Sequence, residues 1–591
     1  MAQRTTIRLL GEPVILRDDG AAPGPRGRKA WALLVYLLLA ERPPTRRRIA
    51  ELLFADAADP LGAVRWNLAQ LRRALGTAAV LEGDPLRLVL GPEVSVDIRD
   101  AGAPAGGLLE GIEFGASPAF ESWLMVERRR YAGQAAAVLH ESALSELAAG
   151  RPDRASELAA RLVALEPFDE GHHELLVRSL AAGGDHTAAL AQAAACRRLF
   201  RQELGREPSR AVREAARPPV GDPGARGDRV AALTHLSAGE AAVAAGAVEH
   251  GVDLLRQASA EASGCRDGAL NARALLALGT ALVHAVRGRD EEGAAVLHEA
   301  LAAAEAAGDR ETLVVALREL AYTGIQAGRR ASVERWLARA DRLAVNDAEH
   351  AAILWVQGMN RSDMGDYAGA RTSLARAVEH SERAGEDRQT AFALSLIGRA
   401  HLLRGETDEA VSPLDRALAL VESERWLAFR PFPEALRGEA DLQRGQIESA
   451  GERLEHAFTL GCTLGDPCWE GLAARNIGLL HRARGEMEAA RDWMDQARER
   501  CVRHPDRYVW MQGYVLDAAI QLRLEAGEDD HAGDLNRALG ALAARTEMRE
   551  LVVRSLLHAA RLGESGALDS ARMLGAELDN PALSALLTAT R

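Results

Sequence analysis

The side chains with the clearest chemistry are arginines near the start of the chain. Between residues 26 and 75 there are ten Lys or Arg residues and four Asp or Glu residues. Such a basic patch suits the phosphates of a nucleic acid, although a solvated helix surface can have the same composition. Arg can pair with the O6 and N7 atoms of guanine, and Gln with the N6 and N7 atoms of adenine. A helix that presents both residue types can therefore read bases in the major groove.

Three short helices are predicted to position these side chains. Asp59-Pro60 is a strong helix start and Gly76 a typical helix end, so a helix is predicted over 60–75. Thr45 is a good N-cap for a helix over 46–54, and a further helix is predicted over 28–40. Short β-like runs flank the helices at 7–10 and 14–16, and then at 80–82, 86–90 and 94–98. The last three runs are predicted to form a hairpin with the shape of a wing.

The predicted helix over 60–75 has a buried stripe of Val64, Leu68, Leu71 and Leu75. The opposite face carries Trp66, Ala69, Gln70 and Arg73, with Arg65 and Arg72 on one flank. We expect Arg65, Gln70 and Arg73 at base edges, with Trp66 beside them. Phosphate contacts are expected from Arg46, Arg47, Arg48 and Arg72, and a wing contact from Arg87. The alternative is an ordinary surface helix, with Trp66 packed on a neighbouring domain.

Three segments of this region resemble the DNA-binding domain of the antibiotic regulatory protein (SARP) family: Gly27–Leu37, Arg48–Phe54 and Arg65–Gly76. The likeness continues through Phe120-Glu121-x-Trp123-Leu124 and the helical pairs up to Ala216, which resemble the bacterial transcriptional activation domain of that family. The resemblance implies a winged helix of the OmpR type that binds promoter direct repeats and recruits RNA polymerase. It covers residues 1 to about 216. Leu86, where relatives often have an aromatic residue, and the base-facing Trp66 depart from the family pattern.

The rest of the chain is a repeat array with a period close to 40 residues. Eight glycines mark it: Gly246, Gly288, Gly328, Gly365, Gly405, Gly445, Gly485 and Gly527. Alanine follows the first seven at a distance of twelve residues, and leucine follows the first six at nine. Glycine precedes four of them by seven residues. This pattern predicts antiparallel helix pairs with the marked glycine in the turn, and it resembles a stretched tetratricopeptide (TPR) repeat. Gly150 and Gly184 are 34 residues apart, which is the usual TPR period. Residues 98–216, the middle domain, are therefore predicted to consist of TPR-like helix pairs as well.

The predicted fold class is therefore mostly α. We expect a winged helix-turn-helix domain over 1–97, an activation domain with TPR-like helices over 98–216, a linker over 217–228 and a TPR-like array over 229–591. The domains differ in charge, because residues 1–97 have a net charge of +3 and the remainder a net charge of −16.

The concave surface of such an array is lined mainly by the first helix of each pair. The candidates for an effector or partner groove are Trp355, Asn360, Arg399, Asn476 and His481, each of which can equally be a packing residue. The flexibly tethered acidic array is expected to bind a protein, peptide or small-molecule effector, or to cover the basic face until a signal arrives. Whether it activates or restrains stays open, as does a homodimer on DNA.

Catalysis is not expected. Lys29 is the only lysine and has no P-loop context, and no motif for catalysis or metal binding stands in the right context. We therefore expect no catalytic residue, no metal and no cofactor. The longest apolar run, 30–40, is too short to span a membrane and no signal core precedes it, so a cytoplasmic protein that associates with the nucleoid on DNA is expected.

Two other classes of protein compete with a transcriptional activator. One is a TPR scaffold or adaptor whose N-terminal domain no longer binds DNA and serves for docking. Such a scaffold has no need for a basic helix face, so the basic face of the helix over 60–75 favours the activator. The other is an ATP-dependent regulator, which would have a nucleotide-binding domain between the DNA-binding domain (the reader, residues 1–97) and the repeats. The absence of a P-loop with its lysine, together with the short linker, excludes this class.

Overall fold

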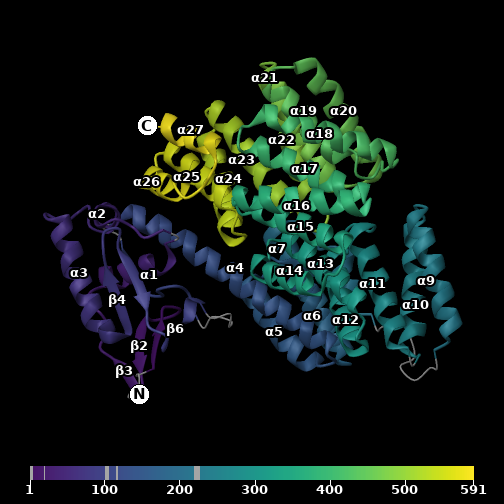
Figure 1. The fold of residues 1–591 in the computed structure, drawn as a ribbon, viewed down its shortest axis with the longest axis horizontal. Coiled ribbons are helices and arrows are strands. Elements are labelled where there is room, and N and C mark those ends of the chain that lie inside the picture. Colours follow the sequence, from purple (N-terminus) through teal and green to yellow (C-terminus); the bar gives the residue numbers. More distant parts are fainter. Residues whose placement is uncertain are drawn as a thin grey trace. The chain divides into compact units, whose positions relative to one another are not determined.

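The computed structural model describes residues 4–18, 20–40, 42–99, 106–114, 117–217, 227–265 and 267–590. These residues form 27 α-helices and six short strands, which confirms the mostly helical class (Figure 1). Most of the predicted linker, residues 218–226, lies outside the described residues. Among the helices that the structure describes, none combines the length and the apolar character needed to cross a membrane.

The chain divides into two compact units. The first consists of residues 1–135 together with residues 523–591, and the second of residues 136–522. These units do not follow the predicted domain limits, which remain predictions for the sequence modules.

The first unit begins with two small sheets. Four strands form a sheet in the order β3-β2-β1-β6, from β1 (Thr5–Arg8), β2 (Val14–Arg17), β3 (Gly20–Ala22) and β6 (Val94–Val96). The second sheet is the hairpin of β4 (Ala79–Glu82) and β5 (Arg87–Leu90), with Val80 opposite Val89.

The run 94–98 does not extend this hairpin, so that part of the prediction was wrong. Its strand β6 pairs in parallel with β1, where Val96 lies opposite Ile7 and both side chains are buried. The Asp97 carboxylate that follows accepts hydrogen bonds from the backbone amides of Leu9 and Leu10, each at 2.9 Å. Local alternation cannot identify the partner of a strand, because a parallel partner is distant in sequence.

The three predicted helices are α1 (Arg28–Leu39), α2 (Arg46–Leu53) and α3 (Pro60–Leu75). Their predicted caps are confirmed. The Thr45 side chain accepts a hydrogen bond from the Arg48 amide, and that of Asp59 accepts one from the Gly62 amide. Gly76 ends α3 with a φ of +57°, in the left-handed region that favours glycine. Local capping chemistry thus sets the limits of the helices that carry the basic patch.

The first unit also contains the first part of α4 (Pro118–Ala148) and the last helices of the chain. These are α24 (Asp529–Arg545), α25 (Arg549–Arg561), α26 (Ala567–Gly575) and α27 (Pro581–Ala589). Phe120 and Trp123 of the family-like motif are buried in the core, where the Trp123 ring packs edge-on against Tyr36 at 5.2 Å between centroids.

The second unit is a succession of antiparallel helices (Figure 1). Before the uncertain segment it has the rest of α4, then α5 (Pro152–Leu165), α6 (Glu170–Ala182), α7 (His186–Leu204) and α8 (Arg210–Glu214). The helices after it are α9 (Arg229–Ala244), α10 (Val248–Ser263), α11 (Gly268–His284), α12 (Asp290–Ala307), α13 (Arg310–Ala327), α14 (Arg330–Leu343), α15 (Asp347–Asp363), α16 (Tyr367–Ala384), α17 (Asp387–Leu403), α18 (Thr407–Ser423), α19 (Pro431–Gln443), α20 (Ile447–Leu464), α21 (Pro467–Ala483), α22 (Met487–Cys501) and α23 (Val509–Glu525).

The predicted turn glycines are confirmed. All eight lie between the two helices of a pair with φ between +73° and +85°. The leucine nine residues later is fully buried in each of the six pairs that have one. In α17, Gly398 faces Leu414 of α18 so closely that a Cβ atom would stand 2.5 Å from the leucine Cγ. The small residue is therefore what lets the two helices approach.

The array packs directly against the middle domain, which corrects the prediction that a flexible linker alone joins them. Leu139 of α4 and Leu175 of α6 share one apolar cluster with Ala294 and Ala295 of α12. Residues 136–217 and the repeats that follow therefore form a single compact body.

Candidate nucleic-acid interface and effector cavity

The exposed face of α3 carries three of the predicted DNA-contacting residues. Trp66 is 52% exposed, although large apolar side chains are usually buried. Arg65 and Arg73 are also exposed, and Arg65 forms an ion pair with Asp59 at 3.3 Å. A surface ion pair of this kind contributes little stability and can be exchanged for a phosphate or a base. This face therefore presents cations and one aromatic ring to the solvent.

Gln70 does not lie on that face, which corrects the prediction for this residue. Its side chain is only 6% exposed. Helix α3 packs against α1, α2 and β4, so that its buried arc is wider than one apolar stripe and also includes Asn67 and Ala74. A side chain at that place does not reach the edge of a base in a groove.

The three arginines of α2 differ in how far their side chains are engaged by other protein groups. Arg47 is 88% exposed in its side chain and has one surface partner, Glu51, at 3.0 Å. Arg48 lies 3.8 Å from the same carboxylate. The Arg46 guanidinium donates to the carbonyl of Gly83 in the turn of the β4–β5 hairpin at 3.3 Å, which leaves it partly committed to protein contacts.

The hairpin is tied to α3 through Arg72. The Nη2 atom of its guanidinium donates to the Leu81 carbonyl at 2.8 Å, and Nε donates to the same oxygen at 3.2 Å. Arg72 thus positions β4 relative to α3 while its side chain stays at the surface. Arg87 is exposed at the start of β5, opposite Glu82.

The C-terminal helices complete the core below these elements. Met573 of α26 is 8% exposed and belongs to the same apolar cluster as α1, α2 and α3. The Tyr36 hydroxyl donates to its sulfur at 3.5 Å, and the Ser570 hydroxyl donates to the Ala119 carbonyl at 2.9 Å. The core of the N-terminal domain therefore depends on residues from the far end of the chain, which no local pattern in the sequence indicates.

The second unit contains a cavity of about 570 Å³, which we call the aromatic cavity. The first helices α11, α13, α15, α17, α19 and α21 lie side by side in sequence order and supply most of its walls. Nine of the chain's 24 Phe, Trp and Tyr residues line it: Tyr322, Trp355, Phe392, Trp426, Phe429, Phe432, Trp469, Tyr508 and Trp510. A chain poor in aromatic residues thus concentrates them in one place, as small-molecule sites do.

Two of the five predicted groove residues line this cavity, Trp355 and Arg399. The other three lie elsewhere. Asn360 is buried and bonded to Arg330 and Glu334, each at 3.0 Å.

Asn476 donates to the Ala435 carbonyl at 3.1 Å, and His481 pairs with Glu486 at 2.5 Å. These side chains support contacts within the array.

Sequence reasoning missed most of the aromatic residues of the cavity. A usable pattern was present in the distance of each ring from the turn glycine that follows it. Trp355 stands ten residues before Gly365, Phe392 thirteen before Gly405, and Trp469 sixteen before Gly485. Phe432 also stands thirteen residues before Gly445, so over these four successive repeats the rings move away from the turn by six residues in all, which is less than two helical turns.

The charged groups of the cavity are mostly paired. Arg287 binds Asp466 at 2.6 Å, and Arg310 binds both carboxylate oxygens of Glu349, at 2.8 and 2.9 Å. Burial, together with the nearby Asp506 carboxylate, raises the pKa of Asp290 well above its usual range. Burial also raises the pKa of Asp466, against the effect of Arg287.

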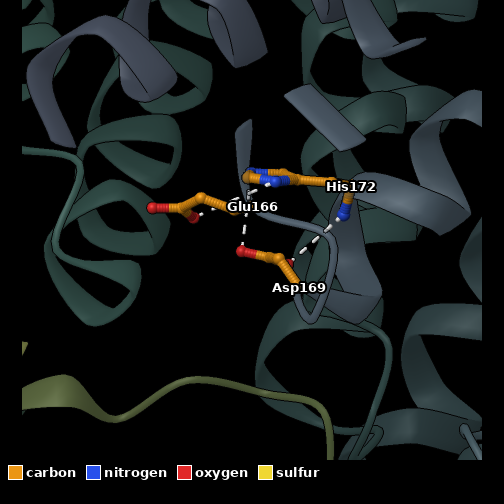
Figure 2. A group of neighbouring side chains, drawn as sticks. All are labelled: Glu166, Asp169 and His172. Carbon is orange, nitrogen blue, oxygen red and sulfur yellow. Dashed lines mark hydrogen bonds and ion pairs between the residues drawn. The ribbon is translucent and has the colours of Figure 1, made fainter. Parts of the chain in front are cut away.

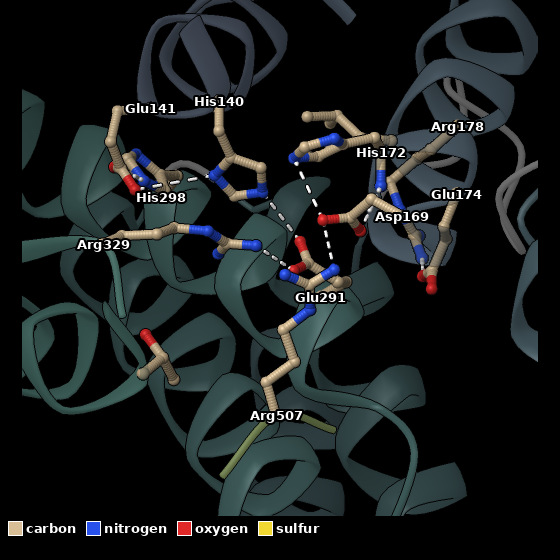
Figure 3. Close-up of polar contacts among 12 residues, drawn as sticks. His140, Glu141, Asp169, His172, Glu174, Arg178, Glu291, His298, Arg329 and Arg507 are labelled. Atoms are coloured by element: carbon tan, nitrogen blue, oxygen red, sulfur yellow. Dashed lines mark hydrogen bonds and ion pairs between the residues drawn. The ribbon is translucent and has the colours of Figure 1, made fainter. Parts of the chain in front are cut away.

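A second polar cluster joins the middle domain to the array (Figure 3). His140 Nε2 lies 2.8 Å from Glu291 Oε2, and His298 Nε2 lies 3.1 Å from Glu141 Oε2. Arg329 pairs with Glu291. Burial opposes the charge of Glu141, but hydrogen bonds from the two histidines lower its pKa from 4.5 to about 2.

Figure 2 shows three side chains of ligand type from this region, Glu166, Asp169 and His172, with one donor atom of each within 4.8 Å of the others. His172 Nδ1 lies 4.0 Å from Glu166, whereas Nε2 lies 3.5 Å from Asp169. The carboxylates thus face opposite edges of the ring, but a metal ion binds one imidazole nitrogen at about 2 Å. Asp169 also caps α6 and pairs with Arg507 (Figure 3). The cluster fits an ion-pair network better than a metal centre.

Comparison with known proteins gives two family matches. The bacterial transcriptional activator domain matches residues 102–217, and the tetratricopeptide repeat matches residues 349–423. The resemblance to SARP activators is confirmed in these two parts. The chain thus combines a transcriptional activator domain with TPR repeats, and neither is an enzyme family.

No curated protein sequence matches the chain significantly. Similar solved structures include a Rap protein complexed with competence and sporulation factor, with 13% identity over 60% of this chain and 88% of that one and a TM-score of 0.41. NprR with its cognate peptide NprX has 14% identity over 52% and 88%, with a TM-score of 0.39. EmbR of Mycobacterium tuberculosis with a low-affinity phosphopeptide has 16% identity over 36% and 64%, with a TM-score of 0.28.

Proposed function

We propose that this SARP-like protein is a transcriptional activator that binds promoter direct repeats through its N-terminal winged helix and recruits RNA polymerase. The observation that carries the proposal is the exposed face of α3, where Trp66 lies between arginines on the same chain as an activator domain. A scaffold without DNA binding gains nothing from exposing this ring and these charges.

The residues divide into two roles. Arg65 and Arg73 contact base edges in the major groove, and Trp66 packs against the sugar or base beside them. Arg47 and Arg48 contact phosphates, and so do Arg46 and Arg72 with the guanidinium hydrogens that their protein contacts leave over. Arg87 contacts the backbone from the hairpin. Phosphate contacts position the protein without reading sequence, so the choice of promoter rests with the first group.

The repeat array is the signal input in this proposal. Its aromatic cavity has the volume of a small-molecule site, and its walls come from six consecutive first helices. A ligand that contacts helices from several repeats can change how they pack against each other. The binding of an effector there then changes the activity of the reader or of the activator domain.

Run-off transcription with purified RNA polymerase tests the proposal. The template carries the tandem site selected by the protein, and a second template carries the same bases in scrambled order. We expect the full chain to raise transcript yield on the first template only, and Arg73→Ala to reduce the difference between the two templates. The matched control, Arg416→Ala, removes a half-exposed arginine of the array that pairs with Glu382 and should leave the yield unchanged. Equal yields on both templates would favour the scaffold.

A further inference from the structure

We infer that the aromatic cavity binds a planar aromatic carboxylate, a fused-ring acid with its carboxylate against Arg399. This inference rests on the proposed function, because it names the class of effector for the same array. Three features of the cavity carry it: the orientation of the rings, the bonding of one buried guanidinium and the state of the acidic groups nearby.

Three pairs of rings in the cavity are stacked, whereas others, such as Phe429 and Trp469 at 82°, meet edge to face. Phe392 and Phe429 have centroids 4.7 Å apart at an interplanar angle of 25°, and Phe429 and Trp426 are 4.3 Å apart at 17°. Phe432 and Trp469 are 4.8 Å apart at 30°. Offset parallel rings present flat faces, which favour a flat ring system in the next stacking position. The volume of about 570 Å³ admits a molecule of two to four fused rings.

Arg399 is the cation with unused bonding capacity. Its side chain is 4% exposed and lines the cavity, and its Nη1 atom donates to Asp363 at 2.8 Å. Its Nη2 atom has no hydrogen-bond partner among the described residues. The Asp363 carboxylate is shared with Arg330 at 3.3 Å. An unsatisfied buried guanidinium nitrogen is costly, and a ligand carboxylate removes that cost through a charge-assisted hydrogen bond.

The position of Arg399 joins the charge to the aromatic wall. Its guanidinium carbon lies 4.4 Å from the centroid of the Trp510 ring, so that the cation and the aromatic surface are parts of one recess. A ligand that stacks on the rings can therefore place an anionic substituent at Arg399 without leaving the cavity.

The acidic side chains of the cavity do not repel an anion. Glu349 is paired with Arg310 and Asp466 with Arg287, and burial raises the pKa of Asp290, which disfavours its charged form. Arg388, which pairs with Glu424 at 3.4 Å, lies over the Trp426 ring with its guanidinium carbon 5.4 Å from the centroid. Because Arg330 and Arg399 share the single carboxylate of Asp363, the charge near Arg399 favours a carboxylate over an amine.

An extended peptide fits the same walls less well. Its backbone amides need side chains that donate and accept along the groove. Asn360 and Asn476 are bonded within the protein, whereas Gln326 and Gln389 line the cavity with Oε1 atoms that have no hydrogen-bond partner among the described residues. Two side-chain amides are too few to satisfy the backbone of an extended peptide, whereas nine aromatic rings line the same cavity.

The test uses the full chain and three matched probe pairs: the carboxylates and carboxamides of naphthalene, anthracene and anthraquinone, all substituted at position 2. Binding is followed by calorimetry and by quenching of tryptophan fluorescence, since four of the nine tryptophans line the cavity. We expect at least one carboxylate to bind tenfold or more tightly than its carboxamide. Arg399→Gln should reduce that ratio to about one, and Arg416→Gln should leave it unchanged.

A second pair of variants tests where the probes bind. Ala352→Phe fills the cavity from α15, whereas Ala368→Phe adds the same ring to an exposed position of α16. The first should weaken binding of the carboxylate tenfold or more, and the second should not. Equal binding of acid and amide, undiminished binding to Ala352→Phe, or no binding by natively folded protein would overturn the inference. So would binding of random heptapeptides that Ala352→Phe blocks, because it would assign the cavity to a peptide.

The same samples separate this inference from the proposed function. Affinity for the selected promoter site is measured with and without the probe that binds best. If the carboxylate binds as expected while promoter affinity and transcript yield do not change, the ligand class stands and the sensor role fails. If peptides bind and change promoter affinity, the sensor role stands and the ligand class fails.

Discussion

The close approach of Gly398 to Leu414 permits a quantitative test of how the repeat pairs are held together. A Cβ atom on Gly398 would stand 2.5 Å from the Leu414 Cγ and 2.6 Å from its Cδ2, whereas ordinary contacts lie beyond 3.4 Å. Overpacking of this kind costs about 1–3 kcal/mol. The higher helix propensity of alanine returns about 1 kcal/mol. We therefore expect Gly398→Ala to destabilise the second unit by up to about 2 kcal/mol.

The substitution of Leu414 has the opposite effect on packing, because it removes atoms where Gly398→Ala adds one. Leu414 is fully buried, so Leu414→Ala leaves a cavity and should cost about 2–5 kcal/mol. In that background the new methyl group at position 398 no longer meets a side chain and occupies part of the cavity. Gly398→Ala should then be neutral or stabilising. The expected coupling between the two substitutions is the relieved overpacking, about 1–3 kcal/mol, which exceeds the additivity error for independent sites.

Urea unfolding followed by circular dichroism measures the four members of this cycle. Gly533 supplies the control, because it is a helical glycine whose nearest atoms to an added Cβ lie at 3.8 and 4.0 Å. Gly533→Ala should stabilise by about 0.5–1 kcal/mol and show no coupling to Leu414→Ala. A stabilising Gly398→Ala in the native background, or additive effects of the two substitutions, would refute the argument that a small residue sets the distance between the helices.

Three further predictions concern the reader, its core and the buried polar cluster. In competition binding, Arg73→Ala should relax preference at one base position by about 1–3 kcal/mol, whereas Arg47→Ala should weaken all sequences alike and lower the salt slope by about one; the reverse assignment would contradict the roles proposed here. Met573→Ala should destabilise the first unit by about 2–5 kcal/mol and raise hydrogen exchange in α1, and unchanged exchange would show that α26 is not part of that core. Because the pKa of Glu141 is lowered from 4.5 to about 2, its carboxylate stabilises the native state above pH 4.5, and this contribution is lost as the pH falls toward 2. Glu141→Gln should thus cost about 3 kcal/mol at neutral pH and flatten the fall in Tm between pH 4.5 and 3, while parallel profiles for both proteins would refute this.

Local features of the structure were predictable because they depend on neighbouring residues. Thr45 and Asp59 cap their helices, and Gly76 ends α3 in the left-handed conformation that its type allows. The turn glycines of the array followed from their spacing alone. These elements obey rules of capping and backbone freedom that a few consecutive residues satisfy.

Features that depend on distant residues were missed. Gln70 is buried because three elements cover α3, and the pairing of β6 with β1 joins segments nearly ninety residues apart. The packing of Met573 beneath the reader has no local signature at all. The aromatic cavity was partly predictable. Its rings are regularly placed along the first helices, but this regularity appears only when each ring is counted from the turn glycine that follows it.

Selection of DNA from a random library by the full chain, followed by a salt titration on the selected site, tests the central claim most directly. The full chain is required, because residues 523–591 complete the compact unit that contains the reader. We predict enrichment of a tandem motif, with an affinity that falls steeply as salt rises, by a slope of about −0.9 for each phosphate contacted. Binding without sequence preference, or no binding by the folded protein, would contradict the claim that this chain is a sequence-specific activator.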